Sequence, residues 1–197
     1  HLLAPLGIRG IPVRAGDTAG MKKAIESDGN LRLVFIETPA NPVLIMTDIA
    51  AASAAAKRHP RSPMVVVDNT FLGPTFQHPL QHGASLVVYS ATKYLSGFSD
   101  LLAGIVLAQD TDLIAQLHGI RAILGNILQP DECWMLDGRL PTVTLRMNRQ
   151  SILNNHYCWR YLSYPEPLNN RHWQHVLFDL IDTYGRKWVN PSLSLHE

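Results

Sequence analysis

The segment YSATKYLSGFSD, residues 89–100, places Lys93 among small hydroxyl side chains. Residues 90–93 directly follow a short, largely apolar run, Ser85 to Tyr89, which has the composition of a buried strand. Lysine is among the residues that are least often buried, so a lysine at this point indicates either a surface loop or a ligand site. Ser90 and Thr92 add two hydroxyl groups beside it.

Polar side chains also follow two other apolar runs. Asn41 comes shortly after residues 31–38, and Asp68 comes directly after residues 64–67. The carboxyl ends of parallel strands meet at one edge of a sheet, and ligands bind in the crevice outside that edge. If these runs are parallel strands, an amide, a carboxylate, hydroxyls and an amine lie close together, and the sequence predicts a binding site there.

This group of side chains has a specific chemical use. A lysine in a dry crevice loses its charge readily, because desolvation disfavours the charged form, and its amine then forms a Schiff base with an aldehyde. Pyridoxal phosphate is the aldehyde cofactor that uses a lysine in this way, and its pyridine nitrogen needs an anionic partner. Asp68 would supply that anion, and Ser90 and Thr92 would donate hydrogen bonds to the phosphate. The residues predict pyridoxal 5'-phosphate as the cofactor and Lys93 as the catalytic residue.

Each of these residues has a simpler interpretation when it is taken alone. Lys93 would be an ordinary surface lysine in a loop. Asp68 could start a turn, and Asn41 precedes a proline, which is a common turn signal. The hydroxyls of Ser90 and Thr92 could bond to nearby backbone groups. Their joint occurrence after successive strands is what favours the binding site.

The sequence predicts no metal site. His78 and His82 have the spacing of two metal ligands on a helix, but no third ligand is evident and pyridoxal chemistry needs no metal. The two cysteines, Cys133 and Cys158, form neither a disulfide framework nor a zinc motif. Cys133 and the adjacent Trp134 are predicted to lie in the core.

The elements that would position the site alternate between strands and helices. Apolar runs rich in branched residues predict strands, and an alanine-rich segment that begins after Thr47 or Asp48 predicts a capped helix. The predicted strands are residues 10–17, 31–38, 63–70, 85–90 and 101–108, and the predicted helices are residues 18–27 and 47–60. This alternation is typical of an α/β fold with a central, mostly parallel sheet flanked by helices.

The composition excludes several classes of protein. The 197 residues are 46% hydrophobic and 17% charged, with a net charge of +1, which is enough apolar material for a core. No basic stripe interleaves with aromatic residues, so no nucleic-acid partner is predicted. The longest apolar run, residues 101–108, is too short to span a bilayer, and no signal peptide is recognisable. We expect a cytoplasmic protein without membrane contact, and the start at His1 suggests a fragment.

Three stretches of sequence resemble the core of the Cys/Met-metabolism pyridoxal-phosphate enzymes. This family includes cystathionine γ-synthase, cystathionine γ- and β-lyases, methionine γ-lyase and O-acetylhomoserine sulfhydrylase. The stretches are VFIETPANPVLIMTDI, VVVDNTFLGPTFQHPLQHGASLVVYSATKYLSGFSD and LLAGIVLA, and the likeness runs from about Leu6 to Asn154, through GNILQPDECWMLDGRLPTVTLRMNRQS. The Ser-Ala-Thr-Lys and Asp-Asn-Thr-Phe stretches together are highly specific for this family.

The resemblance implies an aspartate-aminotransferase-like (type I) large domain and a carbon–sulfur lyase or transferase of sulfur amino-acid metabolism. It makes Lys93 the Schiff-base lysine and Asp68 the partner of the pyridine nitrogen. Ser90 and Thr92 match phosphate contacts, and Asn41 matches a contact to the ring oxygen or the substrate carboxylate. It also implies a sulfur amino-acid substrate and a homo-oligomer, usually a tetramer.

The sequence departs from the family's pattern at both ends. The usual Gly-containing phosphate loop, the ring-stacking tyrosine and the small domain with its carboxylate-binding arginine are not recognisable. We therefore expect residues 1–150 to be a partial cofactor-binding domain, and residues 151–197 to be a divergent, non-homologous tail that results from a disruption of the reading frame or the gene near Asn154. HVLFDLIDTY in this tail could form a short helix. Residues 96–98, Ser-Gly-Phe, replace a common Gly-Gly-His, and we expect that position to be tolerant.

Two other functions follow from these departures. A truncated relative that retains only part of the cofactor site would be catalytically inactive. A module that binds a partner through its aromatic tail would be a third possibility, which rests on composition alone.

Overall fold

The computed structural model describes the backbone of residues 3–162 and the side chains of residues 3–152. The chain divides into two units, His1–Ile152 and Leu153–Glu197, and all the strands described belong to the first. The short helix expected at HVLFDLIDTY and most of the tail at residues 151–197 lie outside the described residues.

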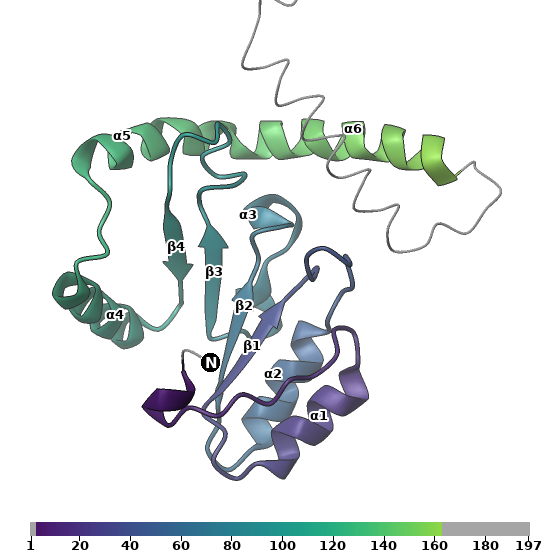
Figure 1. Ribbon diagram of the computed structural model, residues 1–197, viewed down its shortest axis with the longest axis vertical. Coiled ribbons are helices and arrows are strands. Elements are labelled where there is room, and N and C mark those ends of the chain that lie inside the picture. Colours follow the sequence, from purple (N-terminus) through teal and green to yellow (C-terminus); the bar gives the residue numbers. More distant parts are fainter. Residues whose placement is uncertain (1–2, 163–197) are drawn as a thin grey trace, which may run out of the picture. The chain divides into compact units, whose positions relative to one another are not determined.

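A four-stranded sheet lies in the described part of the chain, with the strands in the order β1-β2-β3-β4 (Figure 1). Its strands are β1 (Leu33–Glu37), β2 (Met64–Asp68), β3 (Leu86–Ser90) and β4 (Gly104–Leu107). β1, β2 and β3 are parallel, whereas β4 runs antiparallel to β3. The predicted mostly parallel sheet is therefore confirmed, and the chain reverses direction after β3.

Two helices, α1 (Thr18–Ser27) and α2 (Ile49–Arg58), pack against one face of β1 and β2. Each begins at an aspartate whose carboxylate accepts a hydrogen bond from a first-turn amide: Asp17 from Gly20 at 2.8 Å, and Asp48 from Ala51 at 2.9 Å. The apolar sides of these helices, which carry Ile25, Ala52 and Ala55, form a core with alternate residues of the strands. The strand residues in this core include Val65 and Val67. Both predicted helices are confirmed.

A second core joins β3 to α5 (Pro130–Arg139) and α6 (Val143–Leu162). Its buried members include Val87, Tyr89, Leu101, Leu136 and Met147. This core holds the two helices beside the segment that follows β3, which is the segment that carries Lys93.

The remaining described elements are short or lie outside these two cores. They are α3 (Gly73–Phe76), α4 (Thr111–Leu124) and the 3-10 helices Ala4–Leu6, Pro79–His82 and Leu140–Thr142. None of the described helices combines the length and the apolar composition that a bilayer crossing requires.

Two predictions about these elements are wrong. Residues 10–17 form no strand, because no neighbouring strand in the described residues offers them a ladder of hydrogen bonds. Cys133 and Trp134 lie at the surface rather than in the core, and Trp134 is 78% exposed. α5 instead turns Leu136 inward, and Trp134, two positions earlier, therefore lies on nearly the opposite side of the helix.

Candidate functional site

The three parallel strands end at the same edge of the sheet, as the sequence predicts. Glu37 at the end of β1 is aligned with Asp68 at the end of β2, and Asp68 is aligned with Val88 of β3. Because side chains alternate along a strand, Asp68 and Ser90 point to the same face of the sheet. That face is opposite to the one on which Val67 packs against α1 and α2.

Asp68 is half-buried and has one carboxylate oxygen engaged. Its Oδ1 accepts a hydrogen bond from the backbone amide of Thr70 at 2.9 Å, which fixes the orientation of the carboxylate. Within the described residues no hydrogen bond reaches the other oxygen, Oδ2. Asp68 therefore presents one oriented, negatively charged acceptor to a ligand at the sheet edge.

Lys93 lies in a tight turn directly after β3. Its amide donates to the carbonyl of Ser90 at 3.1 Å, its own carbonyl accepts from the amide of Gly97 at 2.7 Å, and the amide of Ser96 donates to Ala91 at 2.9 Å. Within the described residues the Lys93 side chain is exposed, so a dry crevice around its amine stays a prediction. Backbone geometry, rather than burial, holds this lysine in place.

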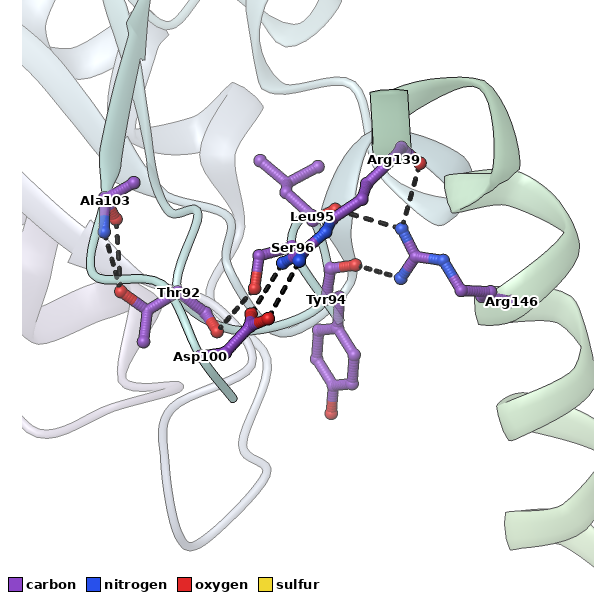
Figure 2. A network of polar contacts seen from close by, with 8 residues as sticks. All are labelled: Thr92, Tyr94, Leu95, Ser96, Asp100, Ala103, Arg139 and Arg146. Carbon is purple, nitrogen blue, oxygen red and sulfur yellow. Dashed lines mark hydrogen bonds and ion pairs between the residues drawn. The ribbon is translucent and has the colours of Figure 1, made fainter. Parts of the chain in front are cut away.

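The two predicted hydroxyl donors differ in their surroundings. Thr92 Oγ1 accepts from the amide of Ala103 at 3.0 Å and donates to its carbonyl at 3.3 Å, so it ties the turn to the residue before β4 (Figure 2). In this structure the hydroxyl of Thr92 is thus bonded to nearby backbone groups, as its simpler interpretation predicts. To contact a phosphate, this hydroxyl would have to give up its hydrogen bonds to Ala103. Ser90 is half-buried, its amide donates to Thr70 Oγ1 at 2.7 Å, and its hydroxyl has no hydrogen-bond partner among the described residues.

Asn41 lies in the loop that follows β1 and is exposed. Its backbone amide donates to Glu37 Oε1 at 3.3 Å, and the amide of Ala40 donates to Ile45 at 2.9 Å, which closes the loop. The loop leaves the same edge of the sheet as Asp68, so Asn41 is near the predicted site in the topology, and its role as a ligand contact remains a prediction.

The positions at 96 and 97 are less tolerant than the sequence suggests. Ser96 is fully buried, and its hydroxyl donates to the carbonyl of Thr92 at 3.3 Å. Gly97 has a positive φ of 77°, which only glycine adopts without strain. Tolerance in this segment is therefore limited to Phe98, which is 61% exposed.

Sequence reasoning missed the polar network centred on Asn69, which is fully buried. Its Nδ2 donates to the carbonyls of Gly73 at 3.0 Å and Gln77 at 2.8 Å and lies 3.1 Å from the hydroxyl of Tyr89. Gln77 Nε2 completes the network by donating to Asn69 Oδ1 at 2.9 Å and to the carbonyl of Thr38 at 3.0 Å. The network joins the ends of β1, β2 and β3, and an asparagine directly after a buried strand was the one signal for it.

Replacing Asn69 by alanine is expected to lower the free energy of unfolding by about 2–4 kcal/mol, because several buried groups lose their hydrogen-bond partners. Urea unfolding followed by circular dichroism measures the change. The exposed Asn41→Ala is the matched control, with an expected effect within about 0.5 kcal/mol. Equal effects of the two substitutions would show that the network does not stabilise the strand ends.

Tyr94, the residue after Lys93, anchors the turn on its other side. Its ring meets Phe71 edge-on, with centroids 6.4 Å apart and an angle of 76° between the planes. Burial raises the pKa of its phenol, because the charged form is poorly solvated there. Tyr94 therefore stays neutral and serves as a packing residue.

Comparisons with known proteins give a consistent result. The sequence model of the family described as "Cys/Met metabolism PLP-dependent enzyme" matches residues 1–165, which extends past Asn154, where we expected the likeness to end. A cystathionine gamma-lyase of Bacillus subtilis (strain 168) is 36% identical over 177 residues, which cover 86% of this chain and 46% of the relative. An L-methionine gamma-lyase of Pseudomonas deceptionensis is 37% identical over 171 residues, covering 81% and 42%.

Solved structures show the same similarity. A methionine gamma lyase from Micromonospora echinospora superposes with a TM-score of 0.78 at 36% identity, covering 83% of this chain and 44% of that one. A cystathionine gamma-lyase from Lactobacillus plantarum, complexed with L-serine, gives a TM-score of 0.76 at 34% identity, covering 85% and 43%. The chain thus spans less than half the length of these relatives.

Proposed function

Because this chain belongs to the Cys/Met-metabolism family of PLP-dependent enzymes, we propose that it acts on sulfur amino acids as a carbon–sulfur lyase or transferase. The observation that carries the proposal is the arrangement of Asp68, Ser90 and Lys93 at one edge of a mostly parallel sheet. These residues lie in the region that matches the family.

The residues present fit pyridoxal 5'-phosphate. Asp68 has an oriented carboxylate oxygen open to a ring N–H, Ser90 has an open hydroxyl for a phosphate oxygen, and Lys93 has an exposed amine for the aldehyde carbon. When bound, this cofactor supplies an electron sink for negative charge on the substrate's carbon atoms. The open groups match the aldehyde, the ring nitrogen and the phosphate.

Each residue then has a distinct task. Lys93 would hold the cofactor through its amine, and the same amine, when displaced by the amine of the substrate, would be placed to move the proton of the substrate α-carbon. Asp68 would hold a proton on the pyridine nitrogen through its negative charge, and Ser90, with Thr92 after a change of partner, would donate hydrogen bonds to the phosphate. Asn41 would bind the ring oxygen or the substrate carboxylate with its amide.

The proposed substrate class is a sulfur amino acid, by analogy with relatives named cystathionine gamma-lyase and L-methionine gamma-lyase. We also propose a cytoplasmic homo-oligomer. The oligomer is supported by large apolar side chains at the surface of the described residues, among them Leu102, Ile123, Trp134 and Leu145. Residues 1–150 would form part of the cofactor-binding domain, and residues 151–197 would form a divergent tail.

Turnover by the purified 197-residue chain tests the proposal. The chain is supplied with pyridoxal phosphate and with methionine, cystathionine or cysteine, and released thiol and 2-oxo acid are measured. We expect product from at least one of them and none from leucine, which has no sulfur leaving group. Cofactor binding without turnover would favour the alternative, an inactive relative that retains part of the site.

A further inference from the structure

The turn that carries Lys93, residues 91–97, is held by an arginine from a distant helix and is called the lysine turn below. Arg146 of α6 donates from its guanidinium to the carbonyl of Tyr94 at 2.5 Å and to that of Leu95 at 2.9 Å (Figure 2). These two carbonyls immediately follow Lys93, at the point where the turn ends. Arg146 therefore supplies the partners that a continuing helix would otherwise provide.

The same guanidinium is fixed on the helix side. Its Nε donates to Thr142 Oγ1 at 3.0 Å, and its Nη2 also donates to the carbonyl of Arg139 at 3.2 Å. Partial burial and the neighbouring charge of Arg139 lower the pKa of Arg146. The side chain is nevertheless charged, because an arginine guanidinium is not deprotonated in proteins. A planar fork with several donors can serve all these acceptors at once, which a lysine ammonium cannot.

Gly97 shows how closely the turn and the guanidinium fit. A Cβ atom at this position would lie 2.3 Å from Arg146 Nη1, and the backbone φ of 77° already requires glycine. The amide of Gly97 also donates to the carbonyl of Lys93 at 2.7 Å. Lys93, Gly97 and Arg146 are thus parts of one packed arrangement.

A second arginine holds the end of the same segment. Arg139 of α5 makes a bidentate ion pair with Asp100, at 2.6 and 2.8 Å, and its guanidinium lies 4.7 Å from the centre of the Phe98 ring. The hydrogen bond from Arg139 lowers the pKa of Asp100, so the pair stays charged at neutral pH. Since Arg146 bonds to the carbonyl of Arg139, the two contacts act together on residues 94–100.

We propose that Arg146 is a positioning residue for Lys93, which fixes the backbone of the lysine turn so that the amine meets the cofactor aldehyde beside Asp68 and Ser90. The inference rests on the proposed function for the identity of the aldehyde. Its structural basis is independent of that identity, because the exposed Lys93 side chain is placed by its backbone, and Arg146 holds the carbonyls that follow it.

The first test measures covalent capture of pyridoxal phosphate by the full chain. Arg146→Lys keeps the positive charge but loses the planar guanidinium with its several N–H donors. We expect this variant to slow the formation of the borohydride-trapped adduct on Lys93 by about tenfold or more. Cofactor affinity before reduction should change much less, because the phosphate contacts are untouched. Arg149→Lys is the matched control on the same helix, since Arg149 is exposed and makes no hydrogen bond or ion pair among the described residues, and it should leave the rate unchanged.

A second test needs no cofactor. Hydrogen exchange of the free chain should be faster by about tenfold at the amides of Ser96 and Gly97 in Arg146→Lys, and unchanged at the amides of β2 and β3. Gly97→Ala places a methyl group against the guanidinium of Arg146. This variant should therefore also slow adduct formation and speed hydrogen exchange in the lysine turn.

The outcomes separate the possibilities. Unchanged capture and unchanged exchange in both variants would overturn the inference. Faster exchange throughout the chain would overturn it as well, since Arg146 would then act on overall stability. If the unsubstituted chain captures no pyridoxal phosphate, the proposed function fails, whereas the exchange experiment still decides whether Arg146 fixes the lysine turn.

Discussion

Lys93→Ala is expected to abolish covalent labelling of the chain by pyridoxal phosphate and borohydride, and to reduce any turnover by at least about a hundredfold. The first effect follows because the amine that forms the bond is removed. The second follows because the same amine moves the proton, a step that alone contributes roughly 10²–10⁴-fold to a rate. Peptide mapping of the reduced adduct measures the labelling, and product formation measures the rate.

The exposed Lys23→Ala in α1 is the control for random modification, and it should leave the adduct intact. An adduct that persists in Lys93→Ala, or that maps to several lysines in the unsubstituted chain, would contradict the assignment of Lys93. Such a result would leave Lys93 as an ordinary surface lysine in a loop.

Asp68→Asn is expected to have the second largest effect, a fall of about a hundredfold in turnover at saturating cofactor. Asparagine keeps the shape of the side chain and can still accept the hydrogen bond from Thr70, so the fold should be preserved. It carries no negative charge, however, and cannot hold a proton on the pyridine nitrogen. Steady-state rates and the melting temperature, measured on the same preparation, separate chemistry from stability.

Glu37→Gln is the matched control, because Glu37 is aligned with Asp68 across the β1–β2 ladder and also ends its strand. It removes an equal charge from the same edge of the sheet. A comparable loss of rate in both variants would mean that the total negative charge at this edge matters, rather than a specific contact from Asp68.

The strands and helices that position the site were readable from local sequence patterns. β2 and β3 are continuous apolar runs, and an aspartate caps the first turn of both α1 and α2. These features depend on residues close together in the sequence, so the sequence pattern predicts the strands and helices. Residues 10–17 failed because strand formation depends on a partner strand, which a local pattern does not contain.

The environment of the site depends on contacts between residues far apart in the sequence, and most of it could not be predicted. The Asn69 network reaches back to Thr38, and Arg146 reaches back to Tyr94 across 52 positions. The identity of Lys93 and Asp68 as candidates came from residue type and order, whereas the exposure of Lys93 and the engagement of Thr92 with Ala103 came only from three-dimensional structure.

The separation between Arg146 and the lysine turn also has a consequence for biosynthesis. The 52 residues from Tyr94 to Arg146 take several seconds to translate, at about 5–20 residues per second. During that interval the nascent chain carries the lysine turn without the guanidinium that later holds it. We therefore expect the lysine of the nascent chain to react more slowly with its aldehyde until the first turns of α6 have left the ribosome.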